Sequence, residues 1–118
     1  QNVSVSSGGG GGDGTMHVAA IDMSAKSAGP NRFIYTTVTI FDEVNVAVAN
    51  ATVYVVTTLP DGSTVSSSGL TGSDGSVTFE WKGRLSGTFT SEVTNVTHAS
   101  LTYDPAANVE TSDSITVQ

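Results

Sequence analysis

The residues Arg32–Asp42 read RFIYTTVTIFD, and this stretch decides the fold. Ile34, Thr36, Val38 and Ile40 share one face of an extended chain, and the residues between them, aromatic rings included, share the other. Because successive side chains of a strand point to opposite faces, this period of two predicts a β-strand. Apolar groups on both faces predict that the strand lies in the middle of a sheet.

Shorter runs with the same period follow along the chain, and turn residues separate them. Pro60-Asp61-Gly62 and Ser73-Asp74-Gly75 predict tight turns, because aspartate accepts local backbone hydrogen bonds and glycine adopts positive φ. A loop is expected at Ser24–Asn31. Strands are expected at residues 16–22, 32–42, 51–59, 64–70, 76–82 and 88–96, with a closing strand from 99–103 and 112–117. About seven short antiparallel strands in two sheets predict an all-β fold of the β-sandwich class.

The side chains expected to point inward from these strands form the predicted core, in which Trp81 supplies the largest ring. This core consists of Val18, Ala20, Val38, Ile40, Val53, Val55, Val77, Phe79, Trp81, Phe89, Val93, Leu101, Ile115 and Val117.

Composition supports strands and narrows the classes of partner. Serine and threonine supply 33 of the 118 residues and valine 16, whereas only 15 residues are charged. The net charge of −7 argues against nucleic acid, anionic membranes and sulfated glycans, all of which need basic side chains. The chain has no cysteine, which excludes disulfides and thiolate metal sites.

The glycine-rich run Ser6–Gly14, SSGGGGGDG, has the composition of a flexible linker. We therefore expect residues 1–14 to be the end of an upstream region and a linker, and residues 15–118 to be the sandwich domain. The chain begins with Gln1 and is interpreted as a monomeric piece of a longer, processed polypeptide. Its partners would then be other domains of that polypeptide.

Three segments carry a resemblance to a known family. Val38–Val53 (VTIFDEVNVAVANATV), the turn at Pro60–Ser63 and Thr71–Phe79 (TGSDGSVTF) resemble bacterial immunoglobulin-like, fibronectin III-like domains. Val93–Asn108 (VTNVTHASLTYDPAAN) is similar to C-terminal domains of secreted bacterial proteases and other hydrolases. The resemblance implies an immunoglobulin-like β-sandwich, a secreted, extracellular location and an accessory role as a spacer, adhesion repeat or module that holds an enzyme near its substrate.

Aromatic side chains are the first candidate ligand-binding residues. Exposed rings beside polar groups bind neutral polysaccharides, because a ring buries the apolar face of a sugar. The candidates are Phe33, Tyr35, Tyr54 and Tyr103. The alternative is that these rings only pack across neighbouring strands.

Carboxylates are the second candidate, because calcium takes six to eight oxygen ligands. The candidate calcium ligands are Asp22, Asp104, Glu110 and Asp113, and a second candidate pair is Asp42 with Glu43. The alternative is that these acids cap turns and keep the surface soluble.

No catalytic motif surrounds either histidine, and we expect His17 and His98 to lie at the surface or at strand ends. The sequence therefore predicts a non-catalytic accessory module, a spacer or interaction domain, of a secreted multidomain bacterial protein, appended to an extracellular hydrolase. The alternative is a carbohydrate-binding module that targets a linked polysaccharide-degrading enzyme to its polymer.

Overall fold

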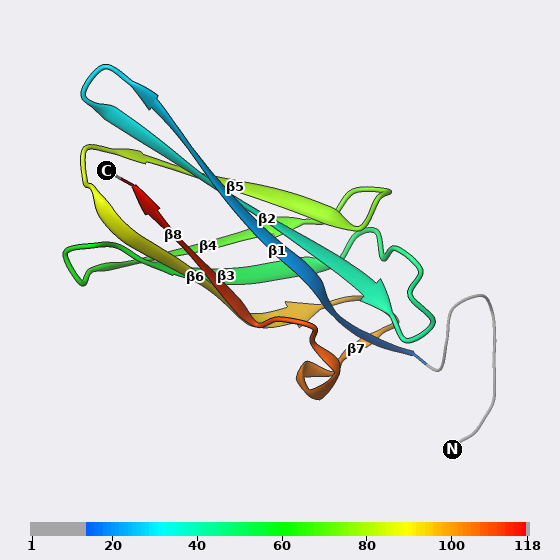
Figure 1. Ribbon diagram of the computed structural model, residues 1–118. Coiled ribbons are helices and arrows are strands. Elements are labelled where there is room, and N and C mark those ends of the chain that lie inside the picture. Colours follow the sequence, from blue (N-terminus) through cyan, green and yellow to red (C-terminus); the bar gives the residue numbers. More distant parts are fainter. Residues whose placement is uncertain (1–13, 118) are drawn as a thin grey trace.

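The computed structural model describes residues 14–117, which fold into two β-sheets stacked face to face (Figure 1). This arrangement confirms the predicted all-β sandwich. Of the predicted linker at residues 1–14, only Gly14 lies within the described residues. The elements are β1 (Thr15–Ala28), β2 (Asn31–Asp42), β3 (Thr52–Thr58), β4 (Thr64–Leu70), β5 (Ser76–Gly83), β6 (Gly87–Thr97), β7 (Thr102–Tyr103), the 3-10 helix η1 (Pro105–Ala107) and β8 (Ser112–Val117).

The strands are divided between a sheet A, in the order β5-β2-β1-β7, and a sheet B, in the order β4-β3-β6-β8. Neighbouring strands are antiparallel except for β1 and β7, which are parallel. The central position predicted for β2 is confirmed, since β1 and β5 pair with its two edges. The four residues predicted to share one face of this strand, Ile34, Thr36, Val38 and Ile40, are all buried, although the predicted core included only Val38 and Ile40.

Strand β1 is longer than its sequence predicts. The loop expected at Ser24–Asn31 is wrong, because β1 continues to Ala28 and Ser24 pairs with Tyr35 of β2. Only Gly29 and Pro30 form the turn between the two strands. The small polar residues of this part of β1 have no apolar alternation of their own, and pairing with β2 makes them a strand.

A bulge in β1 moves one predicted core residue outward. The register shifts between Val18 and Ala20, so that Ile21 pairs with Val38 and is buried. Ala20, predicted to lie in the core, is half-buried on the other face. An extra residue in one strand reverses the facing of everything after it, which the alternation of β1 alone does not reveal.

A second β-bulge occurs in β6. Val55 pairs with Val93 and Tyr54 with Asn95, which leaves Thr94 as the extra residue. Val93 and Val96 are both buried although they are three positions apart. The predicted alternation of β6 therefore holds only as far as Val93.

The interior contains two apolar clusters. Seven predicted core residues are buried, and the half-buried Val77, Phe79, Trp81, Leu101, Ile115 and Val117 pack against the clusters. The Trp81 and Phe89 ring centroids are 4.9 Å apart, across the two sheets. The prediction missed the buried Met16, Ile21, Ile34, Val48, Ala51, Leu59 and Val96.

Three hydroxyl groups lie between the clusters. Thr36 Oγ1 of sheet A is 2.9 Å from Ser91 Oγ of sheet B, which is itself 3.0 Å from Thr57 Oγ1. Along the chain, each of the three residues lies between a residue of one cluster and a residue of the other, two positions away on either side. We call Thr36, Thr57 and Ser91 the hydroxyl triad.

Both predicted turns are present. Asp61 Oδ1 accepts hydrogen bonds from the N–H and the hydroxyl of Ser63, and Asp74 Oδ1 does the same with Ser76. These bonds lower the pKa of both carboxyl groups. Gly75, at φ 80°, has no room for a side chain, because a Cβ there would lie 2.7 Å from the Ile40 carbonyl oxygen.

Candidate functional site

Two of the predicted ligand-binding rings, Phe33 and Tyr35, lie next to each other on the outer face of sheet A. They occupy alternate positions of β2, and the residues on either side of Tyr35, Ile34 and Thr36, are buried in the interior. Residues two apart on a strand are about 6.6–6.8 Å apart along it. The two rings therefore form one row along the central strand of the sheet.

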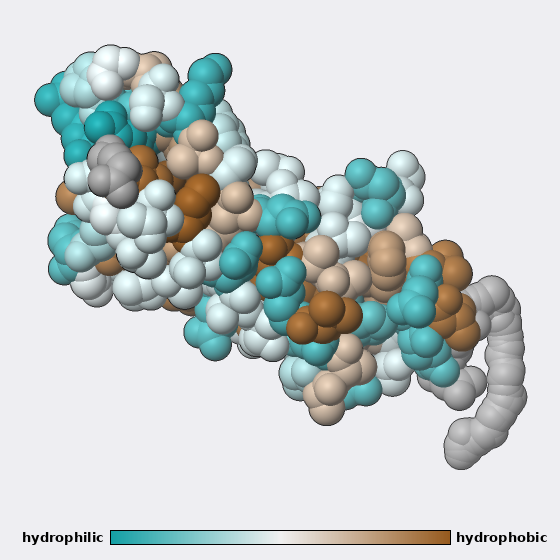
Figure 2. Space-filling model, viewed as in Figure 1, coloured by the Kyte–Doolittle hydropathy of each residue, from teal (hydrophilic) through white to brown (hydrophobic). Residues whose placement is uncertain are grey.

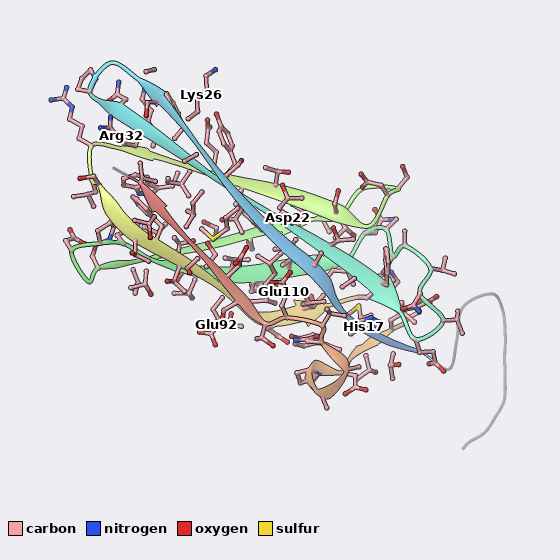
Figure 3. All side chains as sticks on the ribbon, viewed as in Figure 1. His17, Asp22, Lys26, Arg32, Glu92 and Glu110 are labelled. Atoms are coloured by element: carbon pink, nitrogen blue, oxygen red, sulfur yellow. The ribbon has the colours of Figure 1, made fainter. Side chains whose placement is uncertain are left out.

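Basic side chains flank the ring of Phe33. Lys26 of β1 and Lys82 of β5 pair in register with Phe33 from either side. Lys82 Nζ lies 5.7 Å from the centre of the Phe33 ring, which is the range of a cation–π contact. Figure 3 shows Lys26 at the end of the molecule that carries the β1–β2 turn.

The phenol of Tyr35 interacts with Glu80, its partner on β5. Partial burial raises the pKa of Tyr35, and the negative charge of Glu80 and a hydrogen bond to it raise the pKa further. A tyrosine phenol is protonated at neutral pH, so the Tyr35 hydroxyl is the donor in this hydrogen bond to the Glu80 carboxylate. We call Lys26, Phe33, Tyr35, Glu80 and Lys82 the aromatic face.

The other two predicted rings lie elsewhere. Tyr54 is 39% exposed and belongs to β3 in sheet B, where it pairs with Asn95 and Ser68. The Tyr103 hydroxyl accepts a hydrogen bond of 2.7 Å from Asn108 Nδ2, at the side of the sandwich. The four aromatic candidates therefore do not form one site, and only Phe33 and Tyr35 share a surface.

Residues 104–111 bind along the edge of β1, and this explains the position of one predicted calcium ligand. Ile21 N donates to Glu110 Oε2 at 2.7 Å, and Val18 N donates to Asn108 Oδ1 at 2.7 Å. The Val18 carbonyl accepts from Val109 N at 2.9 Å. Glu110 and Asn108 thus take the place of a neighbouring strand where the short β7 has ended.

The remaining predicted calcium ligands are dispersed. Asp22 is exposed on the outer face of sheet A, and Asp113 Oδ1 accepts from Ser114 N at 2.9 Å. Asp104 precedes η1, and its N–H donates to the Met16 carbonyl at 2.8 Å. Within residues 14–117, no group of three or more His, Cys, Asp or Glu side chains could hold a metal ion. The structure therefore does not assemble Asp22, Asp104, Glu110 and Asp113 into a site.

Asp42, the other calcium candidate, stabilises a turn. It is buried at the end of β2, and its Oδ1 accepts from Val44 N and Val46 N, both at 3.0 Å. Asn45 between them adopts φ 64°. The carboxylate oxygen therefore satisfies the backbone of this loop, as the alternative interpretation of the acidic residues expects.

The two histidines differ in their surroundings. His17, expected at the surface or at a strand end, lies near the start of β1 but is buried. His98 Nε2 is 3.1 Å from the Ala49 carbonyl oxygen, and His98 Nδ1 accepts from Ser100 N at 3.1 Å. These contacts hold the loop after β6.

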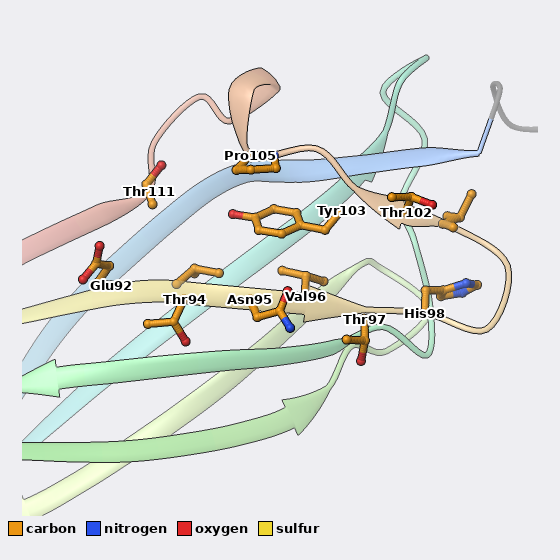
Figure 4. Close-up of a pocket in the computed structure, with 12 residues that line it drawn as sticks. Glu92, Thr94, Asn95, Val96, Thr97, His98, Thr102, Tyr103, Pro105 and Thr111 are labelled. Atoms are coloured by element: carbon orange, nitrogen blue, oxygen red, sulfur yellow. The ribbon is translucent and has the colours of Figure 1, made fainter.

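Sequence reasoning missed a groove that runs along the side of the sandwich (Figure 4). Its volume is about 810 Å³, and it is lined by residues 92–98, 101–103, Pro105 and Thr111. The groove exists because β8 pairs with β6 only as far as Glu92, whereas β6 continues to Thr97. The sequence carries one signal for the groove, because the predicted strand at residues 88–96 is longer than the last predicted segment at residues 112–117.

The chain matches no protein-family model, no curated protein and no solved structure.

The surface is mainly polar. Figure 2 shows small apolar groups separated by hydrophilic residues on the face in view. The large apolar residues that are exposed are Val44, Val46, Tyr54, Val65, Leu70 and Val109. Across residues 14–117, no helix has both the length and the hydropathy to cross a bilayer. On the described part of the chain, residues 14–117, the aromatic face and the groove are both candidate binding features.

Proposed function

We propose that the chain is an immunoglobulin-like, non-catalytic module that spaces neighbouring parts of a secreted multidomain bacterial protein, appended to an extracellular hydrolase. The order of strands supports the immunoglobulin-like assignment. β2 lies between β1 and β5, as strand B lies between A and E in immunoglobulin domains, and β6 lies between β3 and β8, as F lies between C and G. β4 pairs with β3, the place of strand C′.

The single observation that carries the spacer role is that the chain enters and leaves the sandwich at opposite ends (Figure 1). At the entry, the Gly14 carbonyl accepts from Thr102 N at 2.7 Å, just beyond the end of β6. At the exit, Val117 pairs with Gly87, the first residue of β6. A module with this geometry holds the two neighbouring parts of a polypeptide apart by the length of β6.

That separation can be measured with paired spin labels, since the chain contains no native cysteine. Thr15 pairs with Thr102 of β7, in the segment that follows the end of β6, and Thr116 pairs with Thr88 near the start of β6. The nine residue steps of β6 from Thr88 to Thr97 span about 30 Å. Labels on Thr15→Cys and Thr116→Cys should therefore give a narrow distance distribution near this value.

The matched control places the labels on Thr88→Cys and Thr116→Cys, which pair across β6 and β8. This pair should show strong dipolar broadening at close range. If the labels at positions 15 and 116 also came within about 20 Å of each other, both neighbours would leave from one end, and the spacer proposal would be wrong.

A second function, binding of a neutral polysaccharide, is favoured by the aromatic face. Phe33 and Tyr35 form a row of two rings, with charged groups of both signs from β1 and β5 beside them. Rings of this kind pack against the apolar face of a sugar, and the flanking groups can bind its hydroxyls.

Migration of the chain through native gels containing neutral polysaccharides tests this function. We expect retardation that Phe33→Ala and Tyr35→Ala each remove. Tyr54→Ala is the matched control, because Tyr54 is an exposed ring of sheet B. If the chain migrated equally with and without polymer across a broad panel of polysaccharides, the binding proposal would be wrong, and only the spacer role would remain.

A further inference from the structure

The last part of β6, Thr94–Thr97, is an open strand edge beside the groove. On the β8 side, β6 is paired only from Gly87 to Glu92. Val93 N donates to the Thr111 carbonyl at 2.9 Å, and among residues 14–117 no further strand pairs with β6 on this side. Backbone N–H and C=O groups on such an edge can pair with one more strand.

The groove offers an apolar wall opposite this edge. Leu101 and Tyr103 line it from the side of sheet A, and Figure 4 shows the ring of Tyr103 pointing toward β6. Val96, which also lines the groove, is buried. The four residues of the edge span about 13 Å, the length of a short strand. An extended segment with apolar side chains on one face fits this combination of edge and wall.

The charged side chains around the groove are acidic. Glu92 lines the groove and is exposed, and Asp104, Glu110 and Asp113 each lie within two positions of a residue that lines it. Figure 4 shows Glu92 toward one end of the groove and His98 toward the other. Negative charge of this kind attracts a segment that carries Lys or Arg.

The basic side chains of the protein lie far from the groove. The chain has four Lys and Arg residues, and none of them is among the residues that line it. They lie around the β1–β2 turn and the end of β5 that pairs beside it: Lys26, Arg32, Lys82 and Arg84. Met16 pairs with Tyr103 at the groove, and ten residue steps of β1, about 30 Å, separate it from Lys26. This distance exceeds about three Debye lengths at physiological ionic strength, so the basic side chains do not neutralise the charge of the groove.

We propose that the groove binds an extended cationic segment of a partner protein, which adds to sheet B as a strand along Thr94–Thr97. Apolar side chains on one face of the segment pack against Leu101 and Tyr103, and a Lys or Arg side chain near its end reaches Glu92. A second copy of the chain fits less well, because it carries the same net charge of −7 and an edge-to-edge pair would bring two Glu92 carboxylates together.

A synthetic probe tests this inference, which does not depend on the spacer or polysaccharide proposals. The probe is the acetylated, amidated heptapeptide Lys-Val-Ser-Val-Ser-Val-Lys, whose three valines share one face of a strand. Titration of the isotope-labelled full chain should give saturable shifts of the Thr94–Thr97 amide signals. With the peptide bound, those amides that point into the groove should exchange with solvent at least tenfold more slowly. If millimolar peptide gave no saturable shifts, or shifts on another surface only, the proposal would be wrong.

Two matched peptides separate the contributions of charge and of strand pairing. The peptide with glutamate in place of both lysines keeps the valine face and should bind at least tenfold more weakly. The peptide with proline in place of the central valine keeps both lysines but lacks a backbone donor and resists strand pairing, and it should lose most of the binding. Equal binding of either peptide would overturn the proposal, because the groove would then select neither a cation nor a strand as proposed.

Two variants of the chain locate the binding site. Glu92→Lys and Asp22→Lys replace exposed acids and change the net charge equally, but only Glu92 lines the groove. We expect Glu92→Lys to weaken binding of the lysine peptide at least threefold and Asp22→Lys to weaken it less than twofold, with Tm little changed in both. Equal effects would show that net charge alone attracts the peptide, which would contradict the proposal. Protection of Thr94–Thr97 that grows with protein concentration without peptide, together with a dimeric mass, would also contradict it, because a second copy would then supply the strand.

Discussion

Replacement of Ser91 by alanine should destabilise the sandwich through the partners that it leaves behind. Ser91 is 1% exposed and its hydroxyl is the shared member of the hydroxyl triad, bonded to Thr36 and Thr57. Thr36 is 3% exposed, so its hydroxyl loses its partner in a buried position once Ser91 Oγ is gone. Thr57 is half-buried and can regain a water molecule. The loss is therefore dominated by one buried, unsatisfied hydroxyl.

The size of the effect depends on that one hydroxyl. A buried polar group left without a partner costs about 1–3 kcal/mol. For a domain of this size, about 2 kcal/mol lowers Tm by about 8–16 °C. The triple variant Thr36→Val/Thr57→Val/Ser91→Ala replaces all three hydroxyl-bearing side chains by apolar side chains of similar shape. Such a joint replacement changes the free energy of unfolding little. It should therefore recover at least half of the stability that Ser91→Ala loses.

Thermal unfolding followed by circular dichroism, and by the fluorescence of the single tryptophan, measures both variants. Trp81 packs against Phe89, two residues before Ser91, and reports on the same part of the interior. A loss below about 0.5 kcal/mol for Ser91→Ala would refute the reasoning, because the triad would then be hydrated. A triple variant less stable than Ser91→Ala would refute it as well.

Three further predictions concern ionisable groups and one turn. The pKa values of Asp61 and Asp74 are lowered, so their ionised forms stabilise the folded state. This contribution is complete above the unfolded-state pKa of about 4 and is lost as pH falls through the folded-state values. Asp61→Asn/Asp74→Asn should therefore reduce the fall in Tm at acid pH. The pKa of Tyr35 is raised, so its effect on stability has the opposite sign: the contribution is intact below about pH 10 and is lost as pH rises through the folded-state pKa. Tyr35→Phe should therefore reduce the fall in Tm at alkaline pH, and phenolate absorbance of the wild-type chain follows the titration itself. Gly75→Ala should lower the free energy of unfolding, measured in urea, by more than about 1 kcal/mol and by more than Gly62→Ala, because both glycines have positive φ but only the Cβ at position 75 meets backbone atoms; equal losses would show that φ alone matters.

The sequence predicts those parts of the fold that depend on local patterns. The inward face of β2 follows from its alternation, and the turns at Asp61 and Asp74 follow from side chains that bond to their own backbone. The bulges in β1 and β6 are different, because the register of a neighbouring strand defines them. They change the facing of Ile21 and Val96, and no alternation within one strand indicates that change.

The candidate site residues, too, could be predicted from the sequence only in part. Phe33 and Tyr35 share a face because they are two positions apart on one strand, and the sequence predicts this directly. Tyr54 and Tyr103 could not be placed relative to them, since the assignment of strands to sheets depends on contacts far apart in the chain. Glu110 was misinterpreted for a related reason, because its carboxylate completes the hydrogen bonds of an edge 89 residues away.

The stacking of two sheets underlies the separation of the two ends, the aromatic face and the groove alike. It is tested most directly by nuclear Overhauser contacts between Trp81 of β5 in sheet A and Phe89 of β6 in sheet B, whose ring centroids are 4.9 Å apart. We predict strong contacts between the two rings, together with backbone contacts across the β3–β6 pair Val53 and Val96. A folded chain that shows the backbone contacts without any between the Trp81 and Phe89 rings would contradict the account.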